Sequence, residues 1–225
     1  MNILAIDAST ENISLCIMKE GQVAADYNRR MQFGATKLIG YIKKNLEKIA
    51  LSLSDFDAFV IGSGPGSFTG LRISFSIIKA FMLATKKPVI AVSSFFSCAY
   101  PFRNAQRRIA VISDARKGLI YAACFKPKNN TLQSNGKEYL VKLEDIIRQK
   151  RNHLFITHNS HLRKQALERD GNIDFYPKDV YPKARYLLLP AKVHYKNRKF
   201  ISVEKLEPLY LHPKTCQIRN KLKEL

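Results

Sequence analysis

The sequence predicts an α/β protein of two lobes in tandem, each a mixed sheet with a three-strand meander and flanking helices. Three observations support this fold class. The chain has 225 residues, which is enough for two lobes of about 100 residues each. Apolar patterns typical of strands and helices follow the order β-β-β-α-β-α-β-α twice along the chain. The first strand pattern of each round ends in the same dipeptide, at Asp7-Ala8 and at Asp114-Ala115.

The first round begins with a meander. Residues 3–6 form a short apolar run, which predicts a buried strand that ends at Asp7. Residues 12–19 alternate between large apolar side chains and other residues, and Glu20-Gly21 is typical of a turn into a third strand over residues 22–27. A helical pattern follows over residues 35–50, with its apolar side chains on one side and most of its lysines opposite.

A glycine-rich turn then separates a buried strand over residues 58–61 from a second helix. Such a cluster of glycines indicates positive φ angles or close backbone approach, and either Ser67 or Thr69 can cap the helix. A strand, a glycine turn and a helix N-terminus also form a common anion site, but the spacing fits neither standard nucleotide motif. A phosphate cradle and a structural elbow therefore both remain open. The glycines are Gly62, Gly64, Gly66 and Gly70.

The tip of the first strand gives a second indication of a phosphate site. Asp7 is followed by Ser9 and Thr10, which resembles the first phosphate loop of actin-like ATPases and sugar kinases. The alternative role of Asp7 is that of a turn-capping residue. The candidate nucleotide-binding residues are Asp7, Ser9, Thr10, Gly64 and Gly66.

The helix expected over residues 71–85 carries two apolar ridges. One ridge seats the helix on its own sheet, so the second needs another neighbour, either a helix of this chain or another protein. The first ridge contains Leu71, Phe75, Ile78 and Met82. The second contains Gly70, Ile73, Ile77, Ala80, Phe81 and Ala84.

The remaining patterns complete the two rounds. Residues 88–92 predict a strand, and Ser93-Ser94 can cap a short helix that ends before Pro101. After a basic connector, the second round predicts strands over residues 109–113, 119–125, 132–140, 154–157 and 173–176, and helices over residues 143–151, 161–169 and 182–195. A repeated meander followed by α/β crossovers indicates two ribonuclease-H-like lobes, as in actin and the sugar kinases. We expect these lobes to span residues 1–105 and 106–225.

The charge of the chain is strongly positive and unevenly distributed. The formal net charge is +20, with 38 Lys and Arg against 18 Asp and Glu. Residues 1–105 hold 12 basic and 7 acidic residues, a net +5, which leaves a net +15 for residues 106–225. A basic half suggests a nucleic-acid partner, although a solvated lysine-rich surface gives the same composition. We single out Lys196, Arg198 and Lys199 as candidate nucleic-acid contacts.

Composition also excludes some classes of protein. No apolar run reaches the ~20 residues that a membrane-spanning helix needs, and the N-terminus lacks the features of a signal peptide. The four cysteines, Cys16, Cys98, Cys124 and Cys216, are scattered without the paired spacing of zinc or redox sites. The sequence therefore predicts a cytoplasmic protein with reduced thiols.

Several motifs together resemble the bacterial TsaB (YeaZ) family in order and spacing. The most specific is the run Gly64-Pro65-Gly66-Ser67-Phe68-Thr69-Gly70-Leu71-Arg72-Ile73. The supporting motifs are Leu4-Ala5-Ile6-Asp7-Ala8-Ser9-Thr10, Val92-Ser93-Ser94, Asp114-Ala115-Arg116-Lys117-Gly118, Tyr121-Ala122-Ala123 and Pro208-Leu209-Tyr210-Leu211.

The resemblance implies an actin-like protein needed for N6-threonylcarbamoyladenosine at position 37 of tRNA. It implies a non-catalytic scaffold that dimerises with the catalytic subunit TsaD, with the ATPase TsaE joining and tRNA held by the complex. The resemblance implies that this chain needs no cofactor of its own. Whether ATP or ADP binds at the boundary with the partner stays open. An uncovered apolar ridge also favours a homodimer of the lone chain. The implied interface residues are Leu38, Ile39, Ile42, Gly70, Ile73, Ser74, Ile77, Ala80, Phe81 and Ala84.

The histidines agree with the implied lack of catalysis. TsaD-like enzymes hold iron or zinc with a His-x-x-x-His pair in the N-terminal lobe, whereas all five histidines here lie in the second half. His158 and His161 form the one close pair, and two histidines without a nearby Cys or carboxylate make a poor metal site. We therefore expect neither a metal site nor catalytic residues.

Two enzymatic alternatives remain. A phosphotransferase of the sugar-kinase type would use Asp7, Ser9 and Thr10 around Mg-ATP, with Asp114 as the candidate general base. A metalloprotease, an activity once attributed to relatives of this fold, lacks a ligand set. The chain also departs from the family pattern at Gln32, Phe33, Ser74, Phe96, Leu119 and His212, which affects carried-over contacts rather than the fold.

Overall fold

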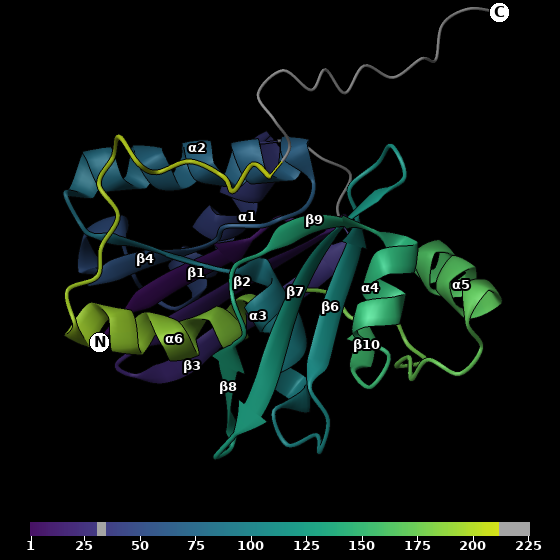
Figure 1. Cartoon of the computed structure of the whole chain (residues 1–225). Helices are drawn as coiled ribbons and strands as arrows, with labels where there is room; N and C mark the ends of the chain where they lie inside the picture. Colours follow the sequence, from purple (N-terminus) through teal and green to yellow (C-terminus); the bar gives the residue numbers. More distant parts are fainter. Residues whose placement is uncertain (31–34, 212–225) are drawn as a thin grey trace, which may run out of the picture.

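Two mixed sheets lie side by side in the computed structural model, each flanked by helices (Figure 1). The structure describes residues 1–30 and 35–211, except the side chains of Ala35 and Thr36. Gln32, Phe33 and His212, where the chain departs from the family pattern, and Cys216 lie outside the described residues.

The first sheet contains the predicted meander and two parallel crossovers. Its strand order is β3-β2-β1-β4-β5. The first three strands are antiparallel neighbours, whereas β1, β4 and β5 run parallel. This arrangement confirms the ribonuclease-H-like topology expected for the first half. The strands are β1 (Ile3–Asp7), β2 (Asn12–Lys19), β3 (Gln22–Arg30), β4 (Ala58–Gly62) and β5 (Val89–Val92).

The second sheet repeats this order with one strand divided in two. Its order is β10-β6-β7-β8, and β9 also pairs with β7. The prediction of a single strand over residues 132–140 is wrong. Two strands, β8 and β9, form there instead, because Gly136, at φ +103°, lies in a turn between them. Residues 173–176 form no strand; they contribute one isolated bridge, Phe155 to Phe175. The strands are β6 (Ile109–Asp114), β7 (Leu119–Lys128), β8 (Thr131–Ser134), β9 (Tyr139–Lys142) and β10 (Leu154–Ile156).

Most helices cover the sheet of their own half. Helices α1 (Ala35–Lys48) and α2 (Phe68–Thr85) pack on one face of the first sheet. Helices α4 (Leu143–Gln149) and α5 (Ser160–Arg169) pack on one face of the second. Two short 3-10 helices, η1 (Leu53–Asp55) and η2 (Tyr100–Phe102), occupy connections. Each core therefore forms where the apolar stripe of a helix meets an apolar sheet face.

Two helices are exchanged between the halves. Helix α6 (Ala184–Lys196), from the second half, packs its buried face on the free face of the first sheet (Figure 1). Helix α3 (Ser94–Ala99), from the first half, packs on the second sheet. The Oγ of Ser97 in α3 donates to the carbonyl of Lys183 and accepts from its N–H, both at 2.7 Å. The proposed lobe boundary after residue 105 stays a prediction, while these two helices join the halves.

Helix α2 is the one helix among the described residues that is long and apolar enough to cross a membrane. That result rests on length and composition alone. One face of α2 is buried in the first core with Leu71, Phe75 and Ile78.

Candidate functional site

The glycine-rich turn packs directly against the loop that follows β1. The backbone N–H of Ser67 donates to the carbonyl oxygen of Ser9 at 2.6 Å. A Cβ on Gly66 would collide with that same carbonyl, and a Cβ on Gly62 would collide with the carboxyl of Asp7. Two of the glycines are thus required by close approach of neighbouring backbone and side chain. This supports the structural elbow among the two roles that the sequence left open.

The remaining features of the turn also hold it in place. Gly64 has φ +90°, a region that favours glycine, and its N–H donates to the Oγ of Ser94 at 3.1 Å. Ser67 is the N-cap of α2, and its side chain accepts from the N–H of Gly70. The glycine-rich segment therefore fixes the direction in which α2 begins and also contacts the loop after β1.

Asp7 is enclosed beneath this turn. Its Oδ1 accepts from the N–H of Ser9 at 2.9 Å and from the Oγ of Ser9 at 2.6 Å. The side chain is fully buried. Burial raises the pKa of the Asp7 carboxyl, and the hydrogen bonds from Ser9 oppose that rise. A magnesium ligand must be ionised and reachable, so Asp7 is poorly placed to hold Mg-ATP.

An open cleft of about 650 Å³ lies between the two halves. Of the five candidate nucleotide residues, the cleft brings together Ser9, Thr10 and Gly66, while Asp7 and Gly64 do not line it. Asp114, the candidate base, lies on its opposite wall. The remaining lining residues are Glu11, Ser67, Phe68, Thr69, Ser113, Ala115, Arg116, Tyr121, His158 and Asn159.

A hydrogen bond links the two halves at this cleft, and a ring contact within the second half lies next to it. The hydroxyl of Tyr181 donates to the Oε1 of Glu11 at 3.2 Å, and the Tyr181 ring lies 5.8 Å from that of His158. Burial lowers the pKa of His158, which the acidic residues Glu11, Asp179 and Asp114 partly offset. Sequence reasoning missed this cluster, because its residues are far apart along the chain.

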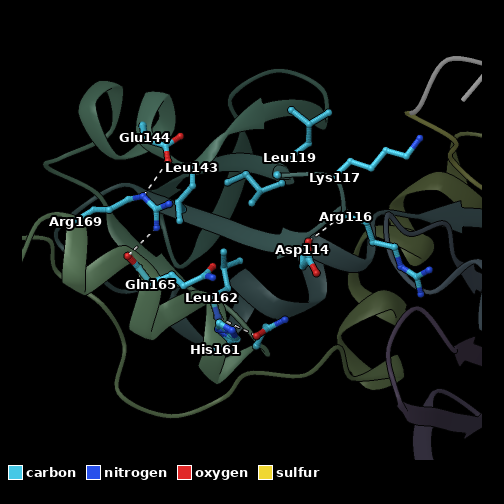
Figure 2. Close-up of a pocket in the computed structure, with 13 residues that line it drawn as sticks. Asp114, Arg116, Lys117, Leu119, Leu143, Glu144, His161, Leu162, Gln165 and Arg169 are labelled. Atoms are coloured by element: carbon cyan, nitrogen blue, oxygen red, sulfur yellow. Dashed lines mark hydrogen bonds and ion pairs between the residues drawn. The ribbon is translucent and has the colours of Figure 1, made fainter. Parts of the chain in front are cut away.

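A second cavity, a pocket of about 450 Å³, lies in the second half (Figure 2). It adjoins the cleft, because Asp114 and Arg116 line both cavities. It is lined by Asp114 and also by His161, whereas His158 lines the cleft. Arg169 donates to Glu144 at 2.9 Å across one rim, so these two charges neutralise each other. The close histidine pair of the sequence therefore faces two different cavities. Leu119, where the family pattern has Glu, contributes an apolar wall here.

The second ridge of α2 is partly covered within this chain. Ile77 is only 5% exposed and packs in the first core with Leu38 and Ile42 of α1. Helix α1 is therefore one neighbour of this ridge, while other residues of the interface set stay uncovered in the lone chain. The buried members are Leu38, Ile42, Gly70, Ser74 and Ile77; the half-buried ones are Ile73 and Phe81; the exposed ones are Ile39, Ala80 and Ala84.

The C-terminal segment covers another side of α2 and runs along it in Figure 1. The N–H of Ile201 donates to the carbonyl of Val89, and the N–H of Leu209 donates to that of Ser63 at 3.0 Å. Tyr210 packs on Phe68, with ring centroids 5.7 Å apart. These contacts explain the Pro208–Leu211 motif as a structural partner of the glycine-rich turn.

A set of apolar and small residues on the two helices is exposed in the lone chain, and we call it the α1–α2 strip. Leu83 is 53% exposed and Ile39 is 48% exposed. Gly40 has no positive φ, and a Cβ there would meet nothing within 4 Å. Neither conformation nor crowding within the described chain requires this helical glycine. Helical spacing from Ala80 could have placed Leu83 in the interface set. The strip consists of Ile39, Gly40, Ala80, Leu83 and Ala84.

Comparisons with known proteins decide the family. The chain is 31% identical to the tRNA threonylcarbamoyladenosine biosynthesis protein TsaB of Bacillus subtilis over 184 residues, which cover 75% of this chain and 76% of that protein. It is 28% identical to TsaB of Escherichia coli over 224 residues, 94% of either chain. The chain belongs to the TsaB family.

Two further comparisons place this TsaB-family chain among its relatives. A family model described as "TsaD: tRNA N6-adenosine threonylcarbamoyltransferase" matches residues 35–193. The solved structure of YeaZ from Pseudomonas aeruginosa superposes with a TM-score of 0.79 at 24% identity, covering 93% of this chain and all of that one. The YeaZ structure confirms the fold. The TsaB relatives connect the chain with the threonylcarbamoyladenosine pathway of tRNA.

Proposed function

We propose that this chain is a non-catalytic scaffold of the enzyme complex that makes N6-threonylcarbamoyladenosine at tRNA position 37. It dimerises with a TsaD-like carbamoyltransferase and activates it. The observation that carries the proposal is the exposed α1–α2 strip in a chain of the TsaB family. Exposed apolar side chains beside small residues permit close packing of helices from a second protein.

The match to the TsaD family model supports the choice of partner. A catalytic subunit with the same fold presents an equivalent pair of helices, so two similar surfaces meet about a pseudo-twofold axis. The same reasoning predicts a homodimer of the lone chain through the α1–α2 strip. The TsaD-like partner then competes with a second copy for this surface.

The glycine-rich turn supports the non-catalytic role. Because Asp7 is buried beneath it, the carboxylate that sugar kinases offer to a metal is withdrawn from the cleft. In the proposed complex the TsaD-like subunit does the chemistry, a TsaE-like ATPase joins, and ATP or ADP binds at the subunit boundary. The complex works in the cytoplasm, and tRNA is held by the assembly.

Reconstitution tests the proposal. The chain is co-purified with the TsaD-like subunit of the same organism, and tRNA modification is measured with and without it. We expect a stable complex, and modification only when the chain is present. A TsaD-like subunit that modifies tRNA fully without this chain would overturn the proposal, as would modification by the chain alone.

The cleft between the halves favours a second candidate, a phosphotransferase using Mg-ATP. Ser9, Thr10 and the first turn of α2 line this cleft opposite Asp114, so phosphate groups would meet N–H and hydroxyl donors there. Steady ATP turnover by the pure chain with a small alcohol or carboxylate would establish this activity. The scaffold predicts no turnover above the spontaneous rate.

A further inference from the structure

The basic residues of the second half differ in whether an acidic side chain balances them. Around α4 and α5, four arginines each form an ion pair within 3.2 Å. Their charges are therefore largely neutralised by their own neighbours. The pairs are Arg148–Asp145, Arg151–Asp170, Arg163–Asp179 and Arg169–Glu144.

The end of α6 shows the opposite pattern. We call Lys192, Lys196, Arg198 and Lys199 the basic end of α6. In the part of the chain that the structure describes, none of the four has a carboxylate within the 4.0 Å of an ion pair. Residues 180–203 contain no Asp or Glu at all. Lys192 and Lys196 are four residues apart on one helix, so these charges lie on one face.

Exposed apolar side chains adjoin these charges. Phe200 is 39% exposed, and its ring meets that of Tyr195 edge-on at 5.6 Å, which holds it in place. Val193, one residue after Lys192, is 55% exposed. A fixed aromatic ring among unpaired cations matches a stacking platform for single-stranded nucleic acid.

Helix capping explains only part of this arrangement. Cations at a helix C-terminus are favoured by the helix dipole, and the N–H of Lys199 donates to the carbonyl of His194 at 2.8 Å to close the last turn. Neither effect requires an exposed ring at residue 200, or explains why none of the four cations forms an ion pair among the described residues. Capping therefore predicts a loss of stability when these charges are removed, but no loss of ligand binding.

The position of the basic end suits a ligand that binds together with a partner protein. Helix α6 covers one face of the first sheet, and α1 and α2 cover the other (Figure 1). A protein on the α1–α2 strip would leave α6 uncovered. Both surfaces can thus be occupied at once.

We propose that the basic end of α6 binds RNA, with the cations on backbone phosphates and the Phe200 ring stacked on an unpaired base. This inference rests on the proposed function, in which the RNA is the tRNA substrate of the complex. Phosphate contacts release counterions, so the affinity depends steeply on salt. Stacking on Phe200 adds a preference for loops, where bases are unpaired.

The test measures tRNA binding by the chain, alone and in its complex, at several salt concentrations. The variant carries Lys196→Gln, Arg198→Asn and Lys199→Gln; Asn suits residue 198, which has φ +52°. The matched control removes three exposed lysines elsewhere in the second half, two on β7 and one in the β8–β9 connection, by Lys126→Gln, Lys128→Gln and Lys137→Gln. We expect the variant to bind tRNA at least about tenfold more weakly at 0.1 M salt, with a shallower salt dependence, and the control to be unchanged.

Two more measurements complete the test. Phe200→Leu keeps the apolar contact with Tyr195 and should still weaken tRNA binding several-fold, because the stacking face is lost. Equal losses in the variant and the lysine control would overturn the inference, as would unchanged binding in the variant. Wild-type chain that binds vesicles of anionic phospholipid but not tRNA would also overturn it. Complex formation is scored separately by co-purification, so failure of the scaffold role is distinguished from failure of this surface.

Discussion

The N–H of Ser67 and the carbonyl oxygen of Ser9 are joined by a hydrogen bond of 2.6 Å. The bond connects the N-cap of α2 with the loop that follows β1. Because Asp7 lies beneath that loop, this one contact contributes both to the position of α2 and to the burial of Asp7. The contact is possible only because Gly66 has no side chain.

Gly66→Ala should destabilise the chain by about 2 kcal/mol or more, since the added Cβ meets backbone that cannot move without breaking the Ser67–Ser9 bond. Urea-induced unfolding measures the change. Gly171→Ala is the matched control, because its Cβ would meet its nearest atom at 3.9 Å. Equal effects of the two substitutions would show that close approach is not what requires Gly66.

Asp7→Asn should change how stability depends on pH. The native pKa of Asp7 is raised by burial, so the folded chain holds this proton to a higher pH than the unfolded chain. The free energy of unfolding of the wild type therefore falls as pH rises from about 3.8 through the native pKa. Asn has no such proton, so the variant should gain stability relative to wild type over this interval. Urea unfolding of both proteins at several pH values measures this change. A difference in the free energy of unfolding between wild type and variant that does not vary with pH would contradict the prediction.

Leu83→Asp should weaken the complex with the TsaD-like subunit more than about tenfold, because a charge would be buried in an apolar interface. The lone variant should stay folded, since Leu83 is largely exposed. Leu167→Asp on α5 is the control, being an exposed leucine far from the strip in sequence. Analytical ultracentrifugation of the mixed subunits measures the affinity, and equal binding by both variants would contradict the assignment of the strip.

Ile77→Asp is not a clean test of the interface, although the sequence suggests it. The side chain packs in the first core, so a carboxylate there should cost about 3 kcal/mol or more and unfold much of the protein. Circular dichroism of the purified variant checks this outcome. If the Ile77→Asp chain instead folded normally and lost only its binding to the TsaD-like subunit, the whole second ridge of α2 would belong to the interface.

Gly40→Ala should have opposite effects on the lone chain and on the complex. Alanine favours a helix over glycine by about 1 kcal/mol, and nothing in the described chain crowds the new methyl group. The melting temperature of the lone chain should therefore rise. If a partner helix approaches closely at Gly40, complex formation should weaken in the same variant. If both the melting temperature of the lone chain and the affinity for the partner rose, close approach of a partner helix at Gly40 would be excluded.

The sequence predicted the parts of this molecule that depend on local pattern. The alternation of residues 12–19 located β2, and Ser67 and Ser93 cap α2 and α3 as expected. Helix α2 begins at Phe68, slightly before the expected residue 71, because the Ser67 cap fixes its start. The family motifs also led to the correct family.

The remaining features depend on contacts between distant segments. An amphipathic pattern shows which face of α6 is buried but not that the first sheet buries it. The same limit applies to Ile77, whose ridge could face α1 or a partner. The cleft contact between Glu11 and Tyr181 joins residues 170 positions apart, and no local signal marks it.

The exchange of α3 and α6 between the halves affects how the protein folds during synthesis and how it unfolds. A ribosome that has released only the first half leaves Ile3, Ala5 and Val60 without their covering helix until α6 has been synthesised. Productive folding must therefore wait for nearly the whole polypeptide. Once formed, neither half can melt without exposing the other, so heating should produce a single cooperative transition, and a protease should find few stable fragments.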